Sequence, residues 1–195
     1  MNSNLIENQT SFNSEKYQLV CGKQNMPLKI LKEENIYQLD FEASNQKYDI
    51  NELMDFKIYN LIERLNEDII EKIEIIKQHS DTEIDILFVF KKIGAQVGMQ
   101  KKYMYIKTYR IKTENLILFK SIDITDDISH PLIAKAERVL CKFANLTIIP
   151  YNNKVRINYK FNIDLCEDLP IYMENLIGLI MKKVFYNVKL FLEKM

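Results

Sequence analysis

The residue types that most often carry catalysis or metal binding are thinly spread along this chain. His79 and His130 are its only histidines, and neither has a cysteine or a carboxylate at the spacing that zinc sites use. Cys166 precedes Glu167 and Asp168, and neighbouring acids raise the pKa of a thiol and suppress its nucleophilic thiolate form. We therefore expect no catalytic residue, no metal ion and no cofactor.

Lys107 is a candidate for binding the polar end of a ligand. It stands between Tyr105 and Tyr109, two residues away on either side, so all three share one face if this stretch is a strand. An ammonium group in an apolar cavity needs an anion or a hydroxyl as partner. A register shifted by one residue would instead turn this face toward water.

Composition and charge restrict the class of protein. The 195 residues are 47% hydrophobic and carry no net charge, which favours one domain with a substantial core and argues against a nucleic-acid partner. The three cysteines form no C-x-x-C pair, and the polar stretch 1–14 lacks the apolar run of a secretory signal. We expect a monomer in the reducing cytoplasm.

Apolar periodicity predicts one helix, a run of strands and a final helix. Residues 155–163 alternate with period two, which is typical of a strand with one buried face. After Pro170, apolar residues recur at helical spacing to about residue 194, which predicts an amphipathic helix with one apolar face. We expect an α+β fold with an antiparallel sheet, a flexible arm at 1–24 and a domain at 25–195. Its strands are expected at 36–43, 69–77, 83–91, 103–110, 115–123, 134–143, 146–150 and 155–163, and its helices at 50–65 and 170–194.

Several short motifs, taken in order, resemble the START family of lipid-transfer domains, a branch of the helix-grip superfamily. The segment Ile163 to Pro170 is similar to the family's lead into its last helix. Lys135-Ala136-Glu137 is similar to its Arg-Ala-Glu strand, Ile148-Ile149-Pro150 to a strand end, and 68–76 with Ser80-Asp81-Thr82 to its first hairpin. The likeness extends from about Asp49 to Met195.

The chain also departs from the family pattern. It contains no tryptophan, whereas the family usually has one after the second helix. A buried acid and arginine often lie inside the family's cavity. Here Lys107 stands at the arginine position, and the acid position falls near Leu87.

The resemblance implies a curved antiparallel sheet wrapped around the C-terminal helix, with a sterol or phospholipid enclosed between them. The ligand would be exchanged at membranes when the helix or a neighbouring loop moves, and 125–131 would be such a loop. Burial of each methylene group contributes about 0.8 kcal/mol. The residues expected to contact the lipid are Leu87, Val89, Tyr105, Lys107, Tyr109, Ile157, Tyr159, Phe161, Met173, Ile177, Ile180, Met181 and Val184.

Two other functions remain open from the sequence. One is a small-molecule-binding or cyclase- or hydrolase-like member of the wider helix-grip superfamily. Such an enzyme would need inward His, Asp or Glu residues that converge in the cavity, and only Asp85 and Lys107 are candidates. An interaction module would have a filled core and no cavity. The periodic stripe of the last helix fits a packed core as well as a cavity wall.

Overall fold

The computed structural model describes residues 17–44, 53, 55–92, 100–152, 154–166 and 173–194. A 10-stranded sheet has the order β1-β2-β3-β10-β9-β7-β6-β5-β4, and neighbours along this path are antiparallel. The short strand β8 lies off the path and pairs in parallel with β6. The strands are β1 (Gln18–Cys21), β2 (Leu28–Leu31), β3 (Ile36–Ser44), β4 (Ile70–Ser80), β5 (Glu83–Phe90), β6 (Lys101–Lys112), β7 (Ile117–Asp123), β8 (Ala136–Arg138), β9 (Leu140–Tyr151) and β10 (Lys154–Asp164).

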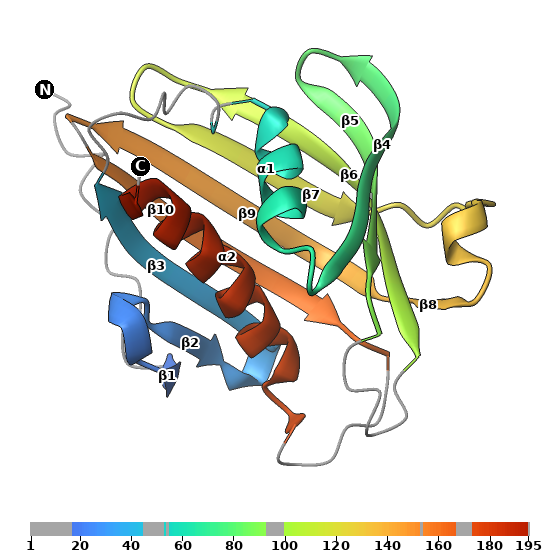
Figure 1. Ribbon diagram of the computed structural model, residues 1–195, viewed down its shortest axis with the longest axis horizontal. Coiled ribbons are helices and arrows are strands. Elements are labelled where there is room, and N and C mark those ends of the chain that lie inside the picture. Colours follow the sequence, from blue (N-terminus) through green and yellow to red (C-terminus); the bar gives the residue numbers. More distant parts are fainter. Residues whose placement is uncertain are drawn as a thin grey trace, which may run out of the picture.

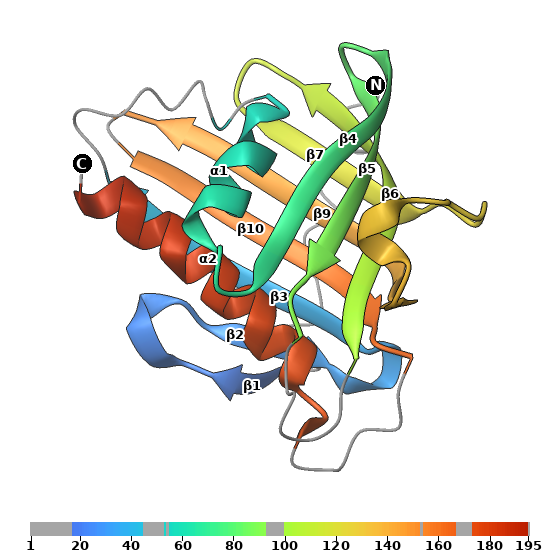
Figure 2. The ribbon, with the colours of Figure 1, turned by 45° about the vertical axis from the view of Figure 1, so that its right-hand side comes forward.

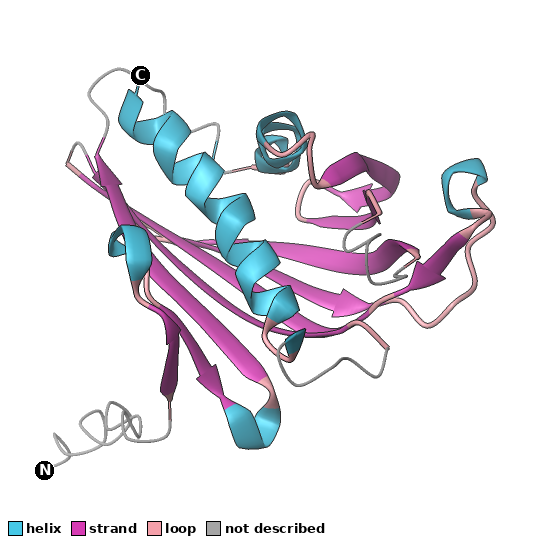
Figure 3. Ribbon diagram, turned by 60° about the horizontal axis from the view of Figure 1, so that its bottom comes forward, coloured by secondary structure: helices cyan, strands magenta, loops and turns pink. Residues whose placement is uncertain are grey.

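Two α-helices lie over one face of this curved sheet, which we call the inner face (Figure 1). Helix α2 (Leu176–Lys194) lies over β3 and β10 and runs in nearly the same direction as these strands, and α1 (Lys57–Leu65) lies beside it toward β4. Figure 3 shows both helices on the same side of the sheet. This is the expected α+β helix-grip arrangement, in which an antiparallel sheet grips a long C-terminal helix. The described residues also include the short 3-10 helices η1 (Lys23–Asn25), η2 (Lys32–Glu34) and η5 (Pro131–Ile133).

The inner face is apolar because the strands alternate as the sequence pattern requires. In β10, Ile157, Tyr159 and Phe161 are buried under α2, while Arg156 lies exposed on the outer face and pairs with Asp40. Strand β3 pairs with β10 along the same register. One large core therefore fills the space between the sheet and the two helices.

A second, smaller apolar cluster lies on the outer face. It contains Leu87, Val89, Tyr105 and Ile133, with partly buried residues between 124 and 136 packed against it. This segment includes η5 and reaches β8 at one side of the sheet (Figure 2). The loop 125–131, expected at the mouth of a cavity, thus adjoins the outer cluster.

The predicted element bounds differ from the observed ones at identifiable points. Helix α1 begins at Lys57, where the carboxylate of Asp55 accepts a hydrogen bond from the Lys57 backbone N–H at 2.6 Å. Predicted strands 134–143 and 146–150 form β8 and the continuous β9 instead, with the break at Val139. The expected arm at 1–24 lies outside the described residues up to position 16, and its part Gln18–Cys21 pairs with β2 as β1. The expected helix start at Pro170 is likewise outside them.

Two lysines of helix α2 donate hydrogen bonds to backbone carbonyls on the β2–β3 side of the sheet. The Lys182 ammonium donates hydrogen bonds to the backbone carbonyls of Lys23, at 2.8 Å, and of Met26. The Lys189 ammonium donates to the carbonyl of Glu42 at 2.9 Å. Both lysines are buried, so these bonds satisfy charges that would otherwise be costly in the interior.

On its other side, α2 is connected to the end of α1 by hydrogen bonds of two asparagines. The Asn187 amide donates to the carbonyl of Leu65 at 3.2 Å and to the Asn66 side chain at 2.9 Å. Asn66 is fully buried and donates to the carbonyl of Ile62 at 2.9 Å. Helix α2 is therefore held along both flanks, next to the space between α1, α2 and the sheet.

Candidate functional site

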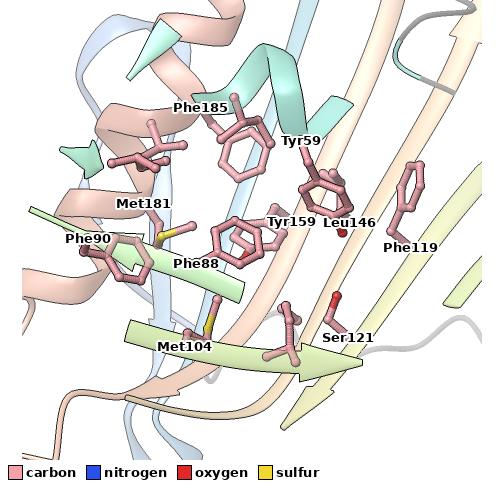
Figure 4. A pocket seen from close by; sticks show the side chains of 15 residues that line it. Tyr59, Phe88, Phe90, Met104, Phe119, Ser121, Leu146, Tyr159, Met181 and Phe185 are labelled. Atoms are coloured by element: carbon pink, nitrogen blue, oxygen red, sulfur yellow. The ribbon is translucent and has the colours of Figure 1, made fainter. Parts of the chain in front are cut away.

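An apolar pocket lies in this space, bounded by α1, α2 and the inner face of six strands. Its volume is about 50 Å³. Figure 4 shows its aromatic side chains around a common space. The lining residues are Tyr59, Ile62, Ile70, Phe88, Phe90, Met104, Ile106, Phe119, Ser121, Ala144, Leu146, Tyr159, Met181, Val184 and Phe185.

Aromatic contacts build most of the pocket wall. The ring of Tyr159 lies 4.7 Å from that of Phe185 on α2. The ring of Tyr59 on α1 meets Phe88 edge-on at 5.6 Å and Phe119 at 6.2 Å. These pairs connect both helices to the sheet. Edge-on and offset ring contacts stabilise the fold in addition to the apolar area that they bury.

Two methionines give the wall an adaptable part. Met104 on β6 and Met181 on α2 line the pocket from opposite elements. Their unbranched side chains change conformation at low cost and fit differently shaped partners.

Three hydroxyl groups form a small polar cluster at the pocket wall, where Tyr59 and Ser121 line the pocket and Thr108 lies behind Ser121. The hydroxyls of Thr108 and Ser121 are buried and lie 2.8 Å apart, so one donates a hydrogen bond to the other. Burial raises the pKa of Tyr59, while hydrogen bonding to Thr108 and Ser121 acts in the opposite direction. Figure 4 shows the Tyr59 ring reaching from α1 toward Ser121 on β7. The described lining contains no carboxylate, amine, guanidinium or imidazole.

Cys141 and Tyr159 lie near these hydroxyls in the core. Burial, and to a smaller extent Asp123, raises the pKa of the Cys141 thiol from its ordinary value of 9.0 to about 12. Burial also raises the pKa of Tyr159 well above its ordinary value of 10.0. Both groups are therefore neutral at physiological pH.

The raised thiol pKa predicts a loss of stability in alkaline solution. Between about pH 10 and pH 11 the Cys141 thiol is ionised in the unfolded chain but keeps its proton in the folded one, so unfolding releases a proton. The free energy of unfolding should then fall by about 1.4 kcal/mol per pH unit through this group. Urea denaturation at a series of pH values measures the slope. Cys141→Ala should remove this part of it, and an unchanged slope in that variant would contradict the prediction.

The structure brings some of the predicted lipid-contact residues to the pocket. Tyr159, Met181 and Val184 line it. The other expected residues of β10, of α2 and of the residues just before α2 belong to the same core or pack against it without lining the pocket; these are Ile157, Phe161, Met173, Ile177 and Ile180.

Five expected residues on β5 and β6 lie on the wrong face. Leu87, Val89 and Tyr105 belong to the cluster on the outer face, and Tyr109 is exposed there. Lys107 shares their face. The register is one residue away from the expected one, so Phe88, Phe90, Met104 and Ile106 point inward.

Lys107 has acidic partners on the outer face. Its ammonium lies 3.0 Å from the Glu83 carboxylate and 3.6 Å from that of Asp85. Hydrogen bonding to Glu83 raises the pKa of Lys107. Asp85 also contacts the His79 ring at 2.8 Å. Both residues considered as inward catalytic groups, Asp85 and Lys107, therefore lie away from the pocket.

Most of the pocket-lining residues are not among those that the sequence pattern indicates. Tyr59 and Ile62 come from α1, and Phe119 and Ser121 from β7. The only local signal was their place on the apolar side of an amphipathic element. Nothing in the spacing of one element shows which others face it across the core.

Two further observations concern the described part of the chain as a whole. None of its helices combines the length and the apolar character that a membrane crossing requires. Its described histidine, cysteine, aspartate and glutamate side chains form no group of three or more that is able to hold a metal ion.

Comparisons with known proteins match the fold of this chain to solved structures. No family model and no curated protein matches the chain. Solved structures do match. Human StAR-related lipid transfer protein 5 superimposes with a TM-score of 0.75 at 15% identity, over 93% of this chain and 88% of that one. The lipid transfer and protein localization domain of human StarD13 gives 0.72 at 10% identity, over 92% and 90%.

A bacterial structure adds to this likeness. The StAR-related lipid transfer protein of Xanthomonas axonopodis gives a TM-score of 0.63 at 12% identity, over 91% of this chain and 96% of that one. The expected resemblance to START domains is thus confirmed at the level of the fold.

Proposed function

We propose that this START-like fold holds one lipid, a sterol or a phospholipid, in the pocket between the sheet and α2. The observation that carries the proposal is the apolar pocket at the centre of the fold, walled on one side by the C-terminal helix. The similar solved structures include proteins described as lipid transfer proteins. Transfer of an apolar molecule into such a space is favourable by about 25 cal/mol per Å² of apolar surface removed from water.

The pocket volume requires a conformational change during uptake. At about 50 Å³ the pocket is far below the roughly 300–1,000 Å³ of sites that enclose drug-sized ligands. The structure is then the closed form, and a lipid is admitted when α2 or a neighbouring loop moves at a membrane surface. The adaptable Met104 and Met181 would take part in this expansion. We place the carrier in the cytoplasm, as a monomer that contacts membranes transiently.

A non-enzymatic role is supported by the chemistry of the pocket. Its described lining offers hydroxyls but no general base to activate them, and Asp85 and Lys107 are engaged on the outer face. Binding and release of a lipid changes no covalent bond, so this role requires neither a general base nor a charged group in the pocket. The lipid contacts that we propose are the observed lining residues, with Tyr159, Met181 and Val184 among them.

The small volume also favours a second candidate, an interaction module with a packed core. In that case the pocket is a packing defect of a kind that folded domains tolerate. The two functions differ in whether the protein takes up lipid at all.

Filling the pocket is expected to abolish lipid uptake. Ala144 lines it from β9, and in Ala144→Leu the larger side chain would occupy the space where the lipid tail begins to insert. Transfer of labelled cholesterol or labelled phosphatidylcholine between phosphatidylcholine vesicles should fall by at least about tenfold. Thr147→Leu, on the outer side of the same strand, is the matched control and should transfer normally. Equal transfer by both variants, or none by the parent protein, would contradict the proposal.

A further inference from the structure

We propose that the hydroxyls of Tyr59, Thr108 and Ser121 anchor the ligand and restrict it to uncharged molecules that carry a hydroxyl group. This inference rests on the proposed function and names the ligand class of the same pocket. We call the three residues the hydroxyl cluster.

The hydroxyl cluster is a small buried polar group in an otherwise apolar wall. Thr108 on β6 and Ser121 on β7 are directly paired across the two strands, and their hydroxyls are buried 2.8 Å apart. Ser121 lines the pocket, as does Tyr59 above it. Ser121 is exposed over only 4% of its surface and Thr108 over none, so water from outside does not readily satisfy them.

The hydrogen-bonding capacity of the cluster exceeds what its members use among themselves. Each hydroxyl has one proton to donate and two lone pairs that accept. The three hydroxyls together hold three protons and six lone pairs. Bonds within the cluster, between Thr108 and Ser121 and from Tyr59 to these two residues, therefore occupy at most three of the lone pairs. Tyr59 keeps its proton because burial raises its pKa. A ligand hydroxyl that reaches Ser121 therefore finds acceptors for its proton and retains its own lone pairs for a donor.

A charged headgroup finds no counter-ion among the described residues that line the pocket. Burying an ionised group without a partner costs several kcal/mol even after relaxation. The buried lysines of α2 are directed elsewhere, Lys182 to the carbonyls of Lys23 and Met26 and Lys189 to that of Glu42. Lys107 binds Glu83 on the outer face. A carboxylate or phosphate inside the pocket would thus remain unpaired, whereas a hydroxyl would not.

Matched six-carbon probes test this assignment, because small molecules demand little expansion of the pocket. Binding of hexane, 1-hexanol and hexanoate to the full chain is measured by nuclear magnetic resonance titration at pH 7. The double variant Ser121→Ala with Thr108→Val removes two hydroxyls with little change in shape. It should weaken 1-hexanol binding by about tenfold, the equivalent of about 1.4 kcal/mol, and leave hexane binding within about twofold. Hexanoate should bind the parent protein at least about tenfold more weakly than 1-hexanol.

The control is Thr147→Val, which removes a hydroxyl on the outer face and should change none of the three affinities. If the double variant does not fold, Ser121→Ala alone is measured, with an expected loss of about threefold for 1-hexanol. Retention of full 1-hexanol affinity in the variant, or hexanoate binding as tight as that of 1-hexanol, would overturn the inference. Failure of all three probes, together with absent lipid transfer, would instead overturn the proposed function.

Discussion

Phe185→Ala is expected to lower the free energy of unfolding by about 3–5 kcal/mol and to enlarge the pocket. Phe185 is only 3% exposed. Its ring packs against Tyr159 at 4.7 Å and against Phe41 at 6.4 Å. Removing a buried phenylalanine forfeits its transfer free energy and leaves a cavity. Urea denaturation followed by circular dichroism measures the loss.

The enlarged pocket should also bind small apolar molecules more tightly, because dry apolar cavities of about 150 Å³ take up benzene. Benzene should therefore raise the melting temperature of Phe185→Ala more than that of the parent protein. Leu179→Ala is the control on the same helix, since Leu179 is 45% exposed. It should change stability by less than about 0.5 kcal/mol. A loss below about 1 kcal/mol for Phe185→Ala would show that its ring does not pack as described.

Gly178→Val should destabilise the protein by about 3 kcal/mol through the contact between α2 and β3. A Cβ atom on Gly178 would lie 2.5 Å from the ring carbon Cε1 of Tyr37 and 3.2 Å from a methyl carbon of Leu28. Tyr37 is fully buried and stacks on Phe161 at 5.3 Å, so its ring has no room to retreat. Overpacking of this kind costs about 1–3 kcal/mol and outweighs the better helix propensity of valine over glycine. Chemical denaturation again measures the change.

Gly22→Val is the matched control for this prediction. A Cβ atom on Gly22 meets only Leu19, at the ordinary distance of 3.5 Å, and its backbone φ of −99° suits any residue. Its effect should stay within about 0.5 kcal/mol. Tyr37→Leu provides a second check, because it opens space for the valine. The cost of Gly178→Val should be smaller in that background, and strict additivity would contradict a direct clash.

The sequence predicts the type of most elements because their apolar residues keep one regular period. In β10, Val155, Ile157 and Phe161 alternate with polar residues and are buried under α2. Only one face of this strand is covered, so the pattern and the burial agree. The order of elements and the motifs near Pro170 then suffice to indicate the helix-grip fold.

The face of β5 is predicted wrongly because both of its faces are buried. All residues from Ile84 to Phe90 are buried, with Leu87 and Val89 under the segment that follows β7 and Phe88 and Phe90 toward the pocket. A strand covered on both sides has no alternation that identifies its inner face. The error carries over to β6, because Leu87 and Tyr105 are paired across the two strands.

The composition of the pocket was less predictable than the fold. Ser121 on β7 is one small polar residue in a strand, and its importance comes from Thr108, which is 13 positions away. Tyr59 reaches the same point from a helix. Only the assembled sheet brings the three hydroxyls together, so no local pattern indicates the hydroxyl cluster.

Native mass spectrometry of the purified chain is the most direct test of whether this protein carries one lipid. The protein is incubated with phosphatidylcholine vesicles that contain cholesterol, separated from them, and weighed intact beside Ala144→Leu. We expect one lipid molecule per chain on the parent protein and none on the variant. The mass of the bare chain for both proteins, under conditions in which vesicles supply lipid in excess, would contradict the lipid carrier and favour a packed interaction module.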